Sequence, residues 1–303
     1  MNVAAVEQAS LFKRIDPKFI GFITLVLGAT AVGIGPIFIR VCETAPVASA
    51  FWRVSLGLPL LFLMSSVKQK TETCRVNPSS RDYLWLIISG IFFAIDLVFW
   101  NTALVYTTVA NASLLANCTP VVVVIVSWVV FRQRPTSNFM IALSITLLGA
   151  FCLVAEDFKL SKEHLIGDLF GILTAFFYGL YMVGLNRFRQ KFSTLKIMTI
   201  TTAASTMALL LLTYSSGQSF EIGSMSGFLA ILGLAFITQV MGQGLIAYGF
   251  AFLPATISSL TMLVAPVVAT LCAWWLFEEA LSTLQAIGII IVLFGISLAK
   301  RQR

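Results

Sequence analysis

The chain is poor in charge. Only 11% of its 303 residues are Asp, Glu, Lys or Arg, against about 25% in a soluble domain. Hydrophobic residues make up 58%, and the mean hydropathy is +0.94, a composition that excludes a water-soluble globular protein. The apolar stretches are roughly twenty residues long, the length that an α-helix needs to cross a bilayer, and they lack the alternating pattern of about ten residues that marks an outer-membrane β-strand. We therefore expect an all-α membrane protein.

Histidine and clustered cysteine are also scarce, with one histidine and five widely spaced cysteines that form no Cys-x-x-Cys pair. This argues against a zinc site and a disulfide framework. No catalytic triad or phosphate-binding loop is recognisable, so we expect neither an enzyme nor a cofactor. The net charge of +7 comes from cations beside apolar stretches. It therefore indicates a lipid bilayer as the partner and not nucleic acid.

Ten membrane spans can be marked along the chain. They are predicted at 19–39, 46–66, 84–105, 108–131, 136–155, 167–186, 195–214, 227–249, 255–277 and 283–299. The first apolar run is longer than the core of about 7–15 residues of a cleavable signal peptide, so it is predicted to be a retained helix. The polar segments 67–82 and 156–166 are predicted to be linkers.

The cations predict the orientation of these spans, because cytoplasmic loops retain Lys and Arg. With the N-terminus inside, 16 of the 20 Lys and Arg residues fall on the cytoplasmic side and three on the other. The remaining one, Arg53, lies inside a span. Both termini, and the loops around Lys70 and Lys191, are therefore predicted to be cytoplasmic.

An internal repeat appears when the sequence is shifted by 146 residues. Trp128 then falls on Trp274, and several Gly, Ile and Phe residues coincide in the same register. We assign one repeat to 19–155 and the other to 167–299. Each holds five spans, an odd number, so the two halves must cross the membrane in opposite directions. Such inverted repeats are common in carriers, where they surround a binding site near the middle of the bilayer.

The segment from Asp96 to Pro120, DLVFWNTALVYTTVANASLLANCTP, resembles the third and fourth helices of EamA-type transporters of the drug/metabolite transporter superfamily. Further positions that fit the pattern are Arg53, the Gly167-Asp168 pair with Tyr178 and Tyr181, and the stretch Pro266 to Glu279. The resemblance covers 19–299 and implies ten helices with both termini cytoplasmic. It also implies export or exchange of amino acids or related small metabolites. One departure is Arg132 to Arg134, where the first repeat of the family often carries an acidic residue.

Two charged residues lie deep within the predicted spans, where an ionisable side chain costs on the order of 2.5–3.5 kcal/mol and suggests a functional site. Asp96 and Arg53 are about 14 Å and about 10 Å from the same membrane face at 1.5 Å per residue. They could form a structural ion pair, or Asp96 could take a proton or the amine of a substrate. Burial favours a protonated carboxyl and a nearby guanidinium favours an ionised one, so a changing separation of the pair could couple transport to protons.

Other polar and aromatic residues fall at a similar depth. The predicted substrate-binding residues are Asp96, Trp100, Asn117, Tyr178, Tyr181, Gln239 and Gln243. Together they have the composition of a small-molecule pocket. Pro36, Pro120 and Pro266 each remove a backbone hydrogen bond from a span and are predicted to be bending points for gating, with fixed kinks as the alternative.

These features predict a carrier of the cell inner (plasma) membrane that moves a small polar molecule by alternating access. Within transport, the alternative is a flippase for a lipid or polyprenyl phosphate, which would need a laterally open groove with several cations. A passive channel is disfavoured by the interrupted, aromatic core. The sequence leaves the substrate, the direction, the use of protons and the choice between monomer and homodimer open.

Overall fold

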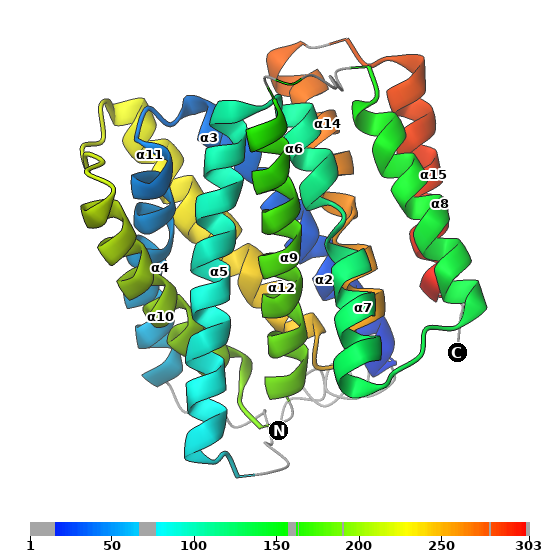
Figure 1. Ribbon diagram of the computed structural model, residues 1–303, viewed down its shortest axis with the longest axis horizontal. Helices are drawn as coiled ribbons and strands as arrows, with labels where there is room; N and C mark the ends of the chain where they lie inside the picture. The colour runs from blue at the N-terminus through cyan, green and yellow to red at the C-terminus, as the bar shows by residue number, and fades with distance from the viewer. Residues whose placement is uncertain are drawn as a thin grey trace, which may run out of the picture.

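The computed structural model describes residues 16–66, 77–156, 162, 164–189, 191–278 and 280–300. They form one bundle of helices that lie roughly along a common direction (Figure 1). Ten helical spans in this part of the chain are long and apolar enough to cross a bilayer: Pro17–Val41, Pro46–Ser66, Ser80–Tyr106, Val109–Phe131, Ser137–Val154, Leu165–Phe188, Thr194–Ser215, Met225–Gly249, Ala255–Leu276 and Thr283–Lys300. The all-α fold predicted from the sequence is confirmed.

Six spans are single helices: α4 (Pro46–Ser66), α5 (Ser80–Tyr106), α8 (Ser137–Val154), α9 (Leu165–Phe188), α10 (Thr194–Ser215) and α15 (Thr283–Lys300). The other four are interrupted, and their parts are α2 (Pro17–Gly33) with α3 (Gly35–Val41), α6 (Val109–Ala116) with α7 (Thr119–Phe131), α11 (Met225–Gly233) with the π-helix η1 (Leu234–Gln243) and α12 (Gly244–Gly249), and α13 (Ala255–Thr261) with α14 (Val264–Phe277). The interruptions give the interior its irregular shape.

Local sequence signals set where the helices begin. Asp16 precedes α2, and its carboxylate accepts a hydrogen bond of 3.0 Å from the backbone N–H of Lys18. Ser79 and Asp82 form a capping box at the start of α5. Such side chains satisfy backbone N–H groups that have no partner within the first turn of a helix.

The outer surface of the bundle is apolar, as a bilayer requires. Large hydrophobic side chains with more than half of their surface exposed include Leu63, Val129, Trp275 and Phe294. In water such a surface would drive association, whereas lipid tails are as apolar as these side chains.

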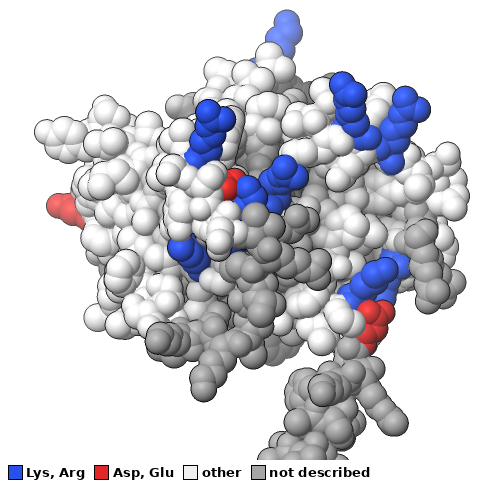
Figure 2. Space-filling view, turned by 90° about the horizontal axis from the view of Figure 1, so that it is seen from below, with Lys and Arg blue, Asp and Glu red and all other residues white. Residues whose placement is uncertain are grey.

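The start of the first described helix and the end of the last one lie together at one end of the bundle. Lys300, the last residue of α15, places its Nζ 4.2 Å from the ring centroid of Phe22 near the start of α2. We call this end the termini face, and the other end the opposite face. Figure 2 looks onto the termini face, where several Lys and Arg side chains stand out.

Cations gather at the span ends on the termini face, as the sequence predicts. Those that lie there among the described residues are Lys18, Arg81, Arg132, Arg134, Arg187, Arg189, Lys191, Lys196 and Lys300. Arg40 and Lys162 lie at span ends on the opposite face. Lys70 and most of the loop 67–82 fall outside the described residues.

The two halves of the chain run in opposite directions through the bundle. α7 and α14 end at Arg132 and Glu278, which are 146 residues apart and share a left-handed backbone conformation, with φ values of 56° and 54°. Figure 1 places the connection after α7 at the termini face and the connection after α14 at the opposite face. Equivalent turns therefore occur at opposite ends of the molecule.

The halves are not identical in shape. Residue 34 separates α2 from α3, but the position 146 residues later lies inside the continuous helix α9. η1 likewise has a regular α-helical counterpart in α5. These differences place more irregular backbone on one side of the interior than a strictly symmetric repeat would.

Candidate functional site

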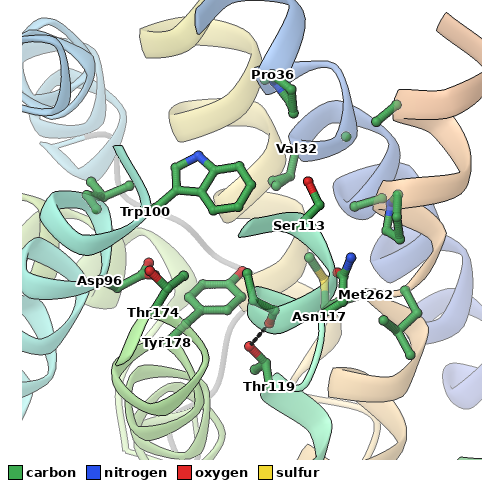
Figure 3. A pocket seen from close by; sticks show the side chains of 18 of the residues that line it. Val32, Pro36, Asp96, Trp100, Ser113, Asn117, Thr119, Thr174, Tyr178 and Met262 are labelled. Atoms are coloured by element: carbon green, nitrogen blue, oxygen red, sulfur yellow. Dashed lines mark hydrogen bonds between the residues drawn. The ribbon is translucent and has the colours of Figure 1, made fainter. Parts of the chain in front are cut away.

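A cavity of about 160 Å³ lies where the interrupted helices meet α4, α5 and α9. Residues of both halves line it, and its walls continue along α3, α6 and α14, the parts that lead from the interruptions to the opposite face. Figure 3 shows side chains from several of these helices converging on the space. The cavity therefore extends from the middle of the bundle toward the opposite face.

The three predicted bending prolines all border this cavity. Pro36, Pro120 and Pro266 lie within the first three residues of α3, α7 and α14, directly after an interruption. A proline has no N–H to continue the preceding helix. The hydroxyl of Thr119 compensates at one interruption by donating a hydrogen bond of 2.7 Å to the carbonyl oxygen of Ala116, the dashed line in Figure 3.

Two buried side chains of opposite charge line the cavity, Arg53 from α4 and Asp96 from α5. They are 8% and 5% exposed. Within the part of the chain that the structure describes, no nitrogen of Arg53 comes within 4.0 Å of an oxygen of Asp96. The structural ion pair considered as one alternative from the sequence is therefore absent in this conformation.

Arg53 is held by an aromatic ring instead. Its guanidinium carbon lies 6.0 Å from the ring centroid of Phe93, within the range of a cation–π contact. Its buried Nε has no hydrogen-bond partner among the described residues. Asp96, one turn further along α5 than Phe93, accepts no hydrogen bond from any described residue either. Both charged groups thus retain unused hydrogen-bonding capacity.

Tyr178 and Gln243 add a polar pair to the lining. The side-chain amide of Gln243, at the end of η1, donates a hydrogen bond of 3.2 Å to the hydroxyl of Tyr178 on α9. The hydroxyl hydrogen of Tyr178 is left available to a ligand. The amide oxygen of Gln243 is buried without a partner in the described structure and offers an acceptor.

Aromatic rings close the cavity on the side of the termini face. Phe93 stacks on Tyr181 with ring centroids 4.6 Å apart, and Tyr178 lies 6.0 Å from Tyr181. Tyr181 is fully buried beneath the cavity and does not line it. The prediction that Tyr181 lines the cavity is wrong, because three residues along α9 move the side chain nearly one turn deeper, where Phe93 covers it.

Gln239 is the second predicted lining residue that lies outside the cavity. It is fully buried, and its amide nitrogen is 3.4 Å from the hydroxyl of Thr202 on α10. The prediction placed Gln239 and Gln243 on one face, as four-residue spacing does in an α-helix. Both belong to η1, yet only Gln243 lines the cavity, because the side chain of Gln239 is directed to Thr202 on α10.

The remaining predicted residues, Trp100 and Asn117, line the cavity together with polar groups that sequence reasoning missed. Thr174 on α9 is buried, and its hydroxyl has no partner in the described structure. Ser113 on α6 also lines the space. Both precede a predicted residue by four positions, Tyr178 and Asn117 respectively, so helical spacing was a signal that could have identified them.

Asp168 has a different position from the cavity residues, although it fits the same sequence pattern. Its carboxylate accepts hydrogen bonds of 2.7 Å from the Thr107 hydroxyl and 2.9 Å from the Asn111 side-chain amide. It thereby fastens the start of α9 to the short connection after α5 and to the first turn of α6. This contact stabilises the bundle near the opposite face.

Comparison with known proteins identifies relatives over nearly the whole chain. An "Uncharacterized transporter" of Archaeoglobus fulgidus is 25% identical over 284 residues, which cover 93% of this chain and 97% of the relative. The "Pseudopaline exporter CntI" of Pseudomonas aeruginosa is 24% identical over 262 residues, with coverages of 86% and 88%. These relatives are named as transporters and not as enzymes.

The fold itself has a solved counterpart. A structure titled "Crystal structure of protein" superposes with a TM-score of 0.74 at 19% identity and covers 93% of this chain and 96% of its own. The sequence model of the EamA-like transporter family matches twice, at residues 19–155 and 165–300, which are almost the whole membrane region. The chain therefore belongs to the EamA-like transporter family.

Proposed function

We propose that this transporter moves small polar metabolites, amino acids or related compounds, across the inner membrane by alternating access, in export or exchange. The observation that carries the proposal is the pair of buried, unpaired charges, Arg53 and Asp96, in the wall of one cavity. Ionisable groups at this depth are costly and are retained for function in membrane proteins. A polar substrate would supply the partners that the protein does not.

The inverted arrangement of the two halves supports alternating access. In carriers of this design, a site near the middle of the bilayer is exposed first to one side and then to the other as the halves rearrange. The interruptions beside Pro36, Pro120 and Pro266 are places where such a rearrangement could occur without breaking a continuous helix. The name of one relative, an exporter, favours export as the direction.

The cations on the termini face support a cytoplasmic location of both termini. With this orientation, the cavity extends toward the outside of the cell, and the rings of Phe93, Tyr178 and Tyr181 separate it from the cytoplasm. The conformation is then the outward-facing member of the transport cycle.

Protons are the coupling ion that we propose, with Asp96 as the group that takes them. Arg53 and Tyr178 are the other charged or titratable side chains that line the same cavity. A movement of Arg53 toward Asp96 would favour the ionised carboxylate, and a movement away would favour the protonated form. Alternation between the two states would couple proton binding to transport.

The flippase alternative would require a groove that opens to the lipid and carries several cations. A hollow of about 450 Å³ lies between α4, α10 and α12, but its lining includes no Lys or Arg among the described residues. Residues that form it include Leu61, Met64, Met198, Met241 and Tyr248. A mostly apolar hollow of this kind suits acyl chains, but among the described residues it offers a phosphate group only the hydroxyls of Thr194 and Tyr248 and no cation, so the metabolite proposal is favoured.

The test combines cells and purified protein. Metabolites that accumulate in or disappear from the medium of producing cells, compared with cells that carry the Asp96→Asn/Arg53→Gln double variant, would identify candidates. Each candidate is then measured in proteoliposomes by counterflow, with and without a pH gradient. We expect at least one small polar metabolite to exchange through the parent protein. Transport confined to phospholipid or polyprenyl phosphate would overturn the proposal.

A further inference from the structure

We propose, on the basis of the proposed function, that the cavity is a receptor for zwitterions, in which Arg53 binds a carboxylate and Asp96 binds the ammonium group of the same molecule. Arg53 and Asp96 are the charged residues among those that line the cavity in the described structure. Their charges sum to zero, so a ligand without net charge but with two charged ends matches both of them.

Ligands with only one charged group match the cavity less well than zwitterions do. An amine would pair with Asp96 and leave the buried guanidinium of Arg53 without a partner, while a carboxylic acid would do the reverse. An uncompensated buried charge weakens binding strongly, because the charge has lost its water and gained nothing in return. The zwitterion is the ligand class that leaves neither group unsatisfied.

The protein keeps its two charges apart by its own construction. Arg53 rests over the ring of Phe93, and Phe93 precedes Asp96 by three positions on α5, nearly one turn. At 1.5 Å per residue, these positions differ by about 4.5 Å along the helix axis. The cationic group therefore lies at the closed end of the cavity, and the anionic group lies one step closer to the opposite face.

The same face of α5 continues with Trp100, four residues beyond Asp96. Phe93, Asp96 and Trp100 thus form a series along one side of the cavity. A bound molecule would place its carboxylate at Arg53, its ammonium group at Asp96 and the remainder beside Trp100. Small and apolar residues of the facing helices, such as Gly33, Ile39 and Ala269, surround that remainder.

Two further polar groups fit this orientation. The hydroxyl hydrogen of Tyr178 can donate to the carboxylate, and the free amide oxygen of Gln243 can accept from the ammonium group. Charge-assisted hydrogen bonds are the stronger kind, so loss of either charged end should weaken binding about 10-fold or more. The carboxylate and ammonium groups, more than the side chain, are expected to determine affinity.

The test measures binding to the full-length protein in detergent, as ligand-induced thermal stabilisation over a concentration series. The probes are the twenty protein amino acids, together with the amine and the carboxylic acid that share the side chain of each probe that binds. We expect at least one amino acid to bind about 10-fold or more tightly than both of its matched analogues. Tighter binding of amines or acids, or no binding by any amino acid, would overturn the proposal.

Variants separate the two ends of the receptor. Arg53→Gln should abolish the preference for the amino acid over its matched amine. Asp96→Asn should abolish the preference for the amino acid over its matched carboxylic acid. Each variant should leave the other preference unchanged. Arg53→Lys, which keeps the charge, should restore part of the carboxylate contribution. Arg134→Gln and Glu221→Gln remove exposed charges remote from the cavity and should leave both preferences intact. An equal loss of both preferences in Arg53→Gln and in Asp96→Asn, with the melting temperature of each unliganded variant unchanged, would contradict the assignment.

Failure of the zwitterion receptor model can be distinguished from failure of the proposed transport function. Exchange of a purely anionic or cationic metabolite in proteoliposomes, combined with no binding of amino acids, would overturn the receptor model and leave the transporter of polar metabolites in place. Exchange of lipid alone would overturn both.

Discussion

Gly149 on α8 and Gly288 on α15 approach each other so closely that a Cβ atom on Gly288 would lie 2.9 Å from the carbonyl oxygen of Gly149. The backbone N–H of Leu153 would lie 3.0 Å away, so neither neighbour is a flexible side chain that could move aside. Close packing at these glycines joins the last helices of the two halves.

We therefore predict that Gly288→Ala destabilises the protein by about 1–3 kcal/mol, the usual range for overpacking. Gly244→Ala is the matched control, because nothing lies within 4 Å of the position that its Cβ would occupy. The measurement is the temperature at which half of the detergent-solubilised protein loses its monodisperse profile. Equal melting of the two variants would show that α8 and α15 can separate without loss of stability.

The left-handed residues at the ends of α7 and α14 give a second prediction. An L-residue other than glycine pays about 1–2 kcal/mol for this conformation, whereas glycine adopts it readily but loses more entropy on folding. Arg132→Gly and Glu278→Gly should each stabilise the protein by about 0.5–1 kcal/mol. Arg132→Ala and Glu278→Ala keep the strained backbone and should give no gain. Stabilisation by alanine as well would assign the effect to the lost side chain.

Trp100 should be important for transport but not for insertion. Trp100→Ala removes a large wall of the cavity, so we expect weaker substrate exchange with unchanged membrane abundance. Trp275→Ala is the control, since Trp275 is 76% exposed on the outer surface of α14. Counterflow in proteoliposomes with equal amounts of protein measures the effect. Similar rates for both variants would place the substrate away from Trp100.

Asp96→Asn tests the coupling to protons. The variant should retain its fold and some substrate exchange, but that exchange should no longer respond to a pH gradient, because an amide cannot take up the proton. Gradient-driven flux and counterflow are compared in the same vesicles. If the variant responds to the gradient as the parent protein does, Asp96 is not the coupling group. Arg53→Ala should in addition reduce stability, because it removes the side chain that packs over the ring of Phe93 in the cavity wall.

The orientation in the membrane is tested with single cysteines in a chain that lacks its five native ones. A cysteine at position 70 or 134 should be protected from an impermeant thiol reagent added to intact cells. A cysteine at Glu221, on the opposite face, should be labelled. Labelling of position 70 from outside, with protection at 221, would reverse the proposed topology.

The spans could be predicted well from the sequence, because twenty-residue apolar runs have few other structural solutions. The interruptions at Pro36, Pro120 and Pro266 followed from the missing N–H of proline. The π-helix that contains Gln239 could not be predicted, since no local residue type specifies it. Gln239, which lies in it, bonds to Thr202 on α10 and does not line the cavity.

The depth of a residue along its helix predicted the cavity lining better than its angular position around the helix did. Asp96, Asn117 and Tyr178 were predicted from their depth, and all three line the cavity. Tyr181 lies nearly one turn deeper than Tyr178 and is covered by Phe93, a residue that composition alone does not distinguish from any other core phenylalanine. The distance between Arg53 and Asp96 was likewise inaccessible, because it depends on the rotamer that Phe93 stabilises.

The separation of Arg53 from Asp96 has a kinetic consequence. If the cavity closes while empty, water leaves two unlike charges that have no partner, at a cost of several kcal/mol per ion. A ligand with complementary ends removes most of that barrier, so the loaded protein would reorient faster than the empty one. The slow step of a net, one-way cycle would then be the unloaded return. Substrate on the far side should accelerate efflux, and the protein would carry out exchange faster than net, one-way transport.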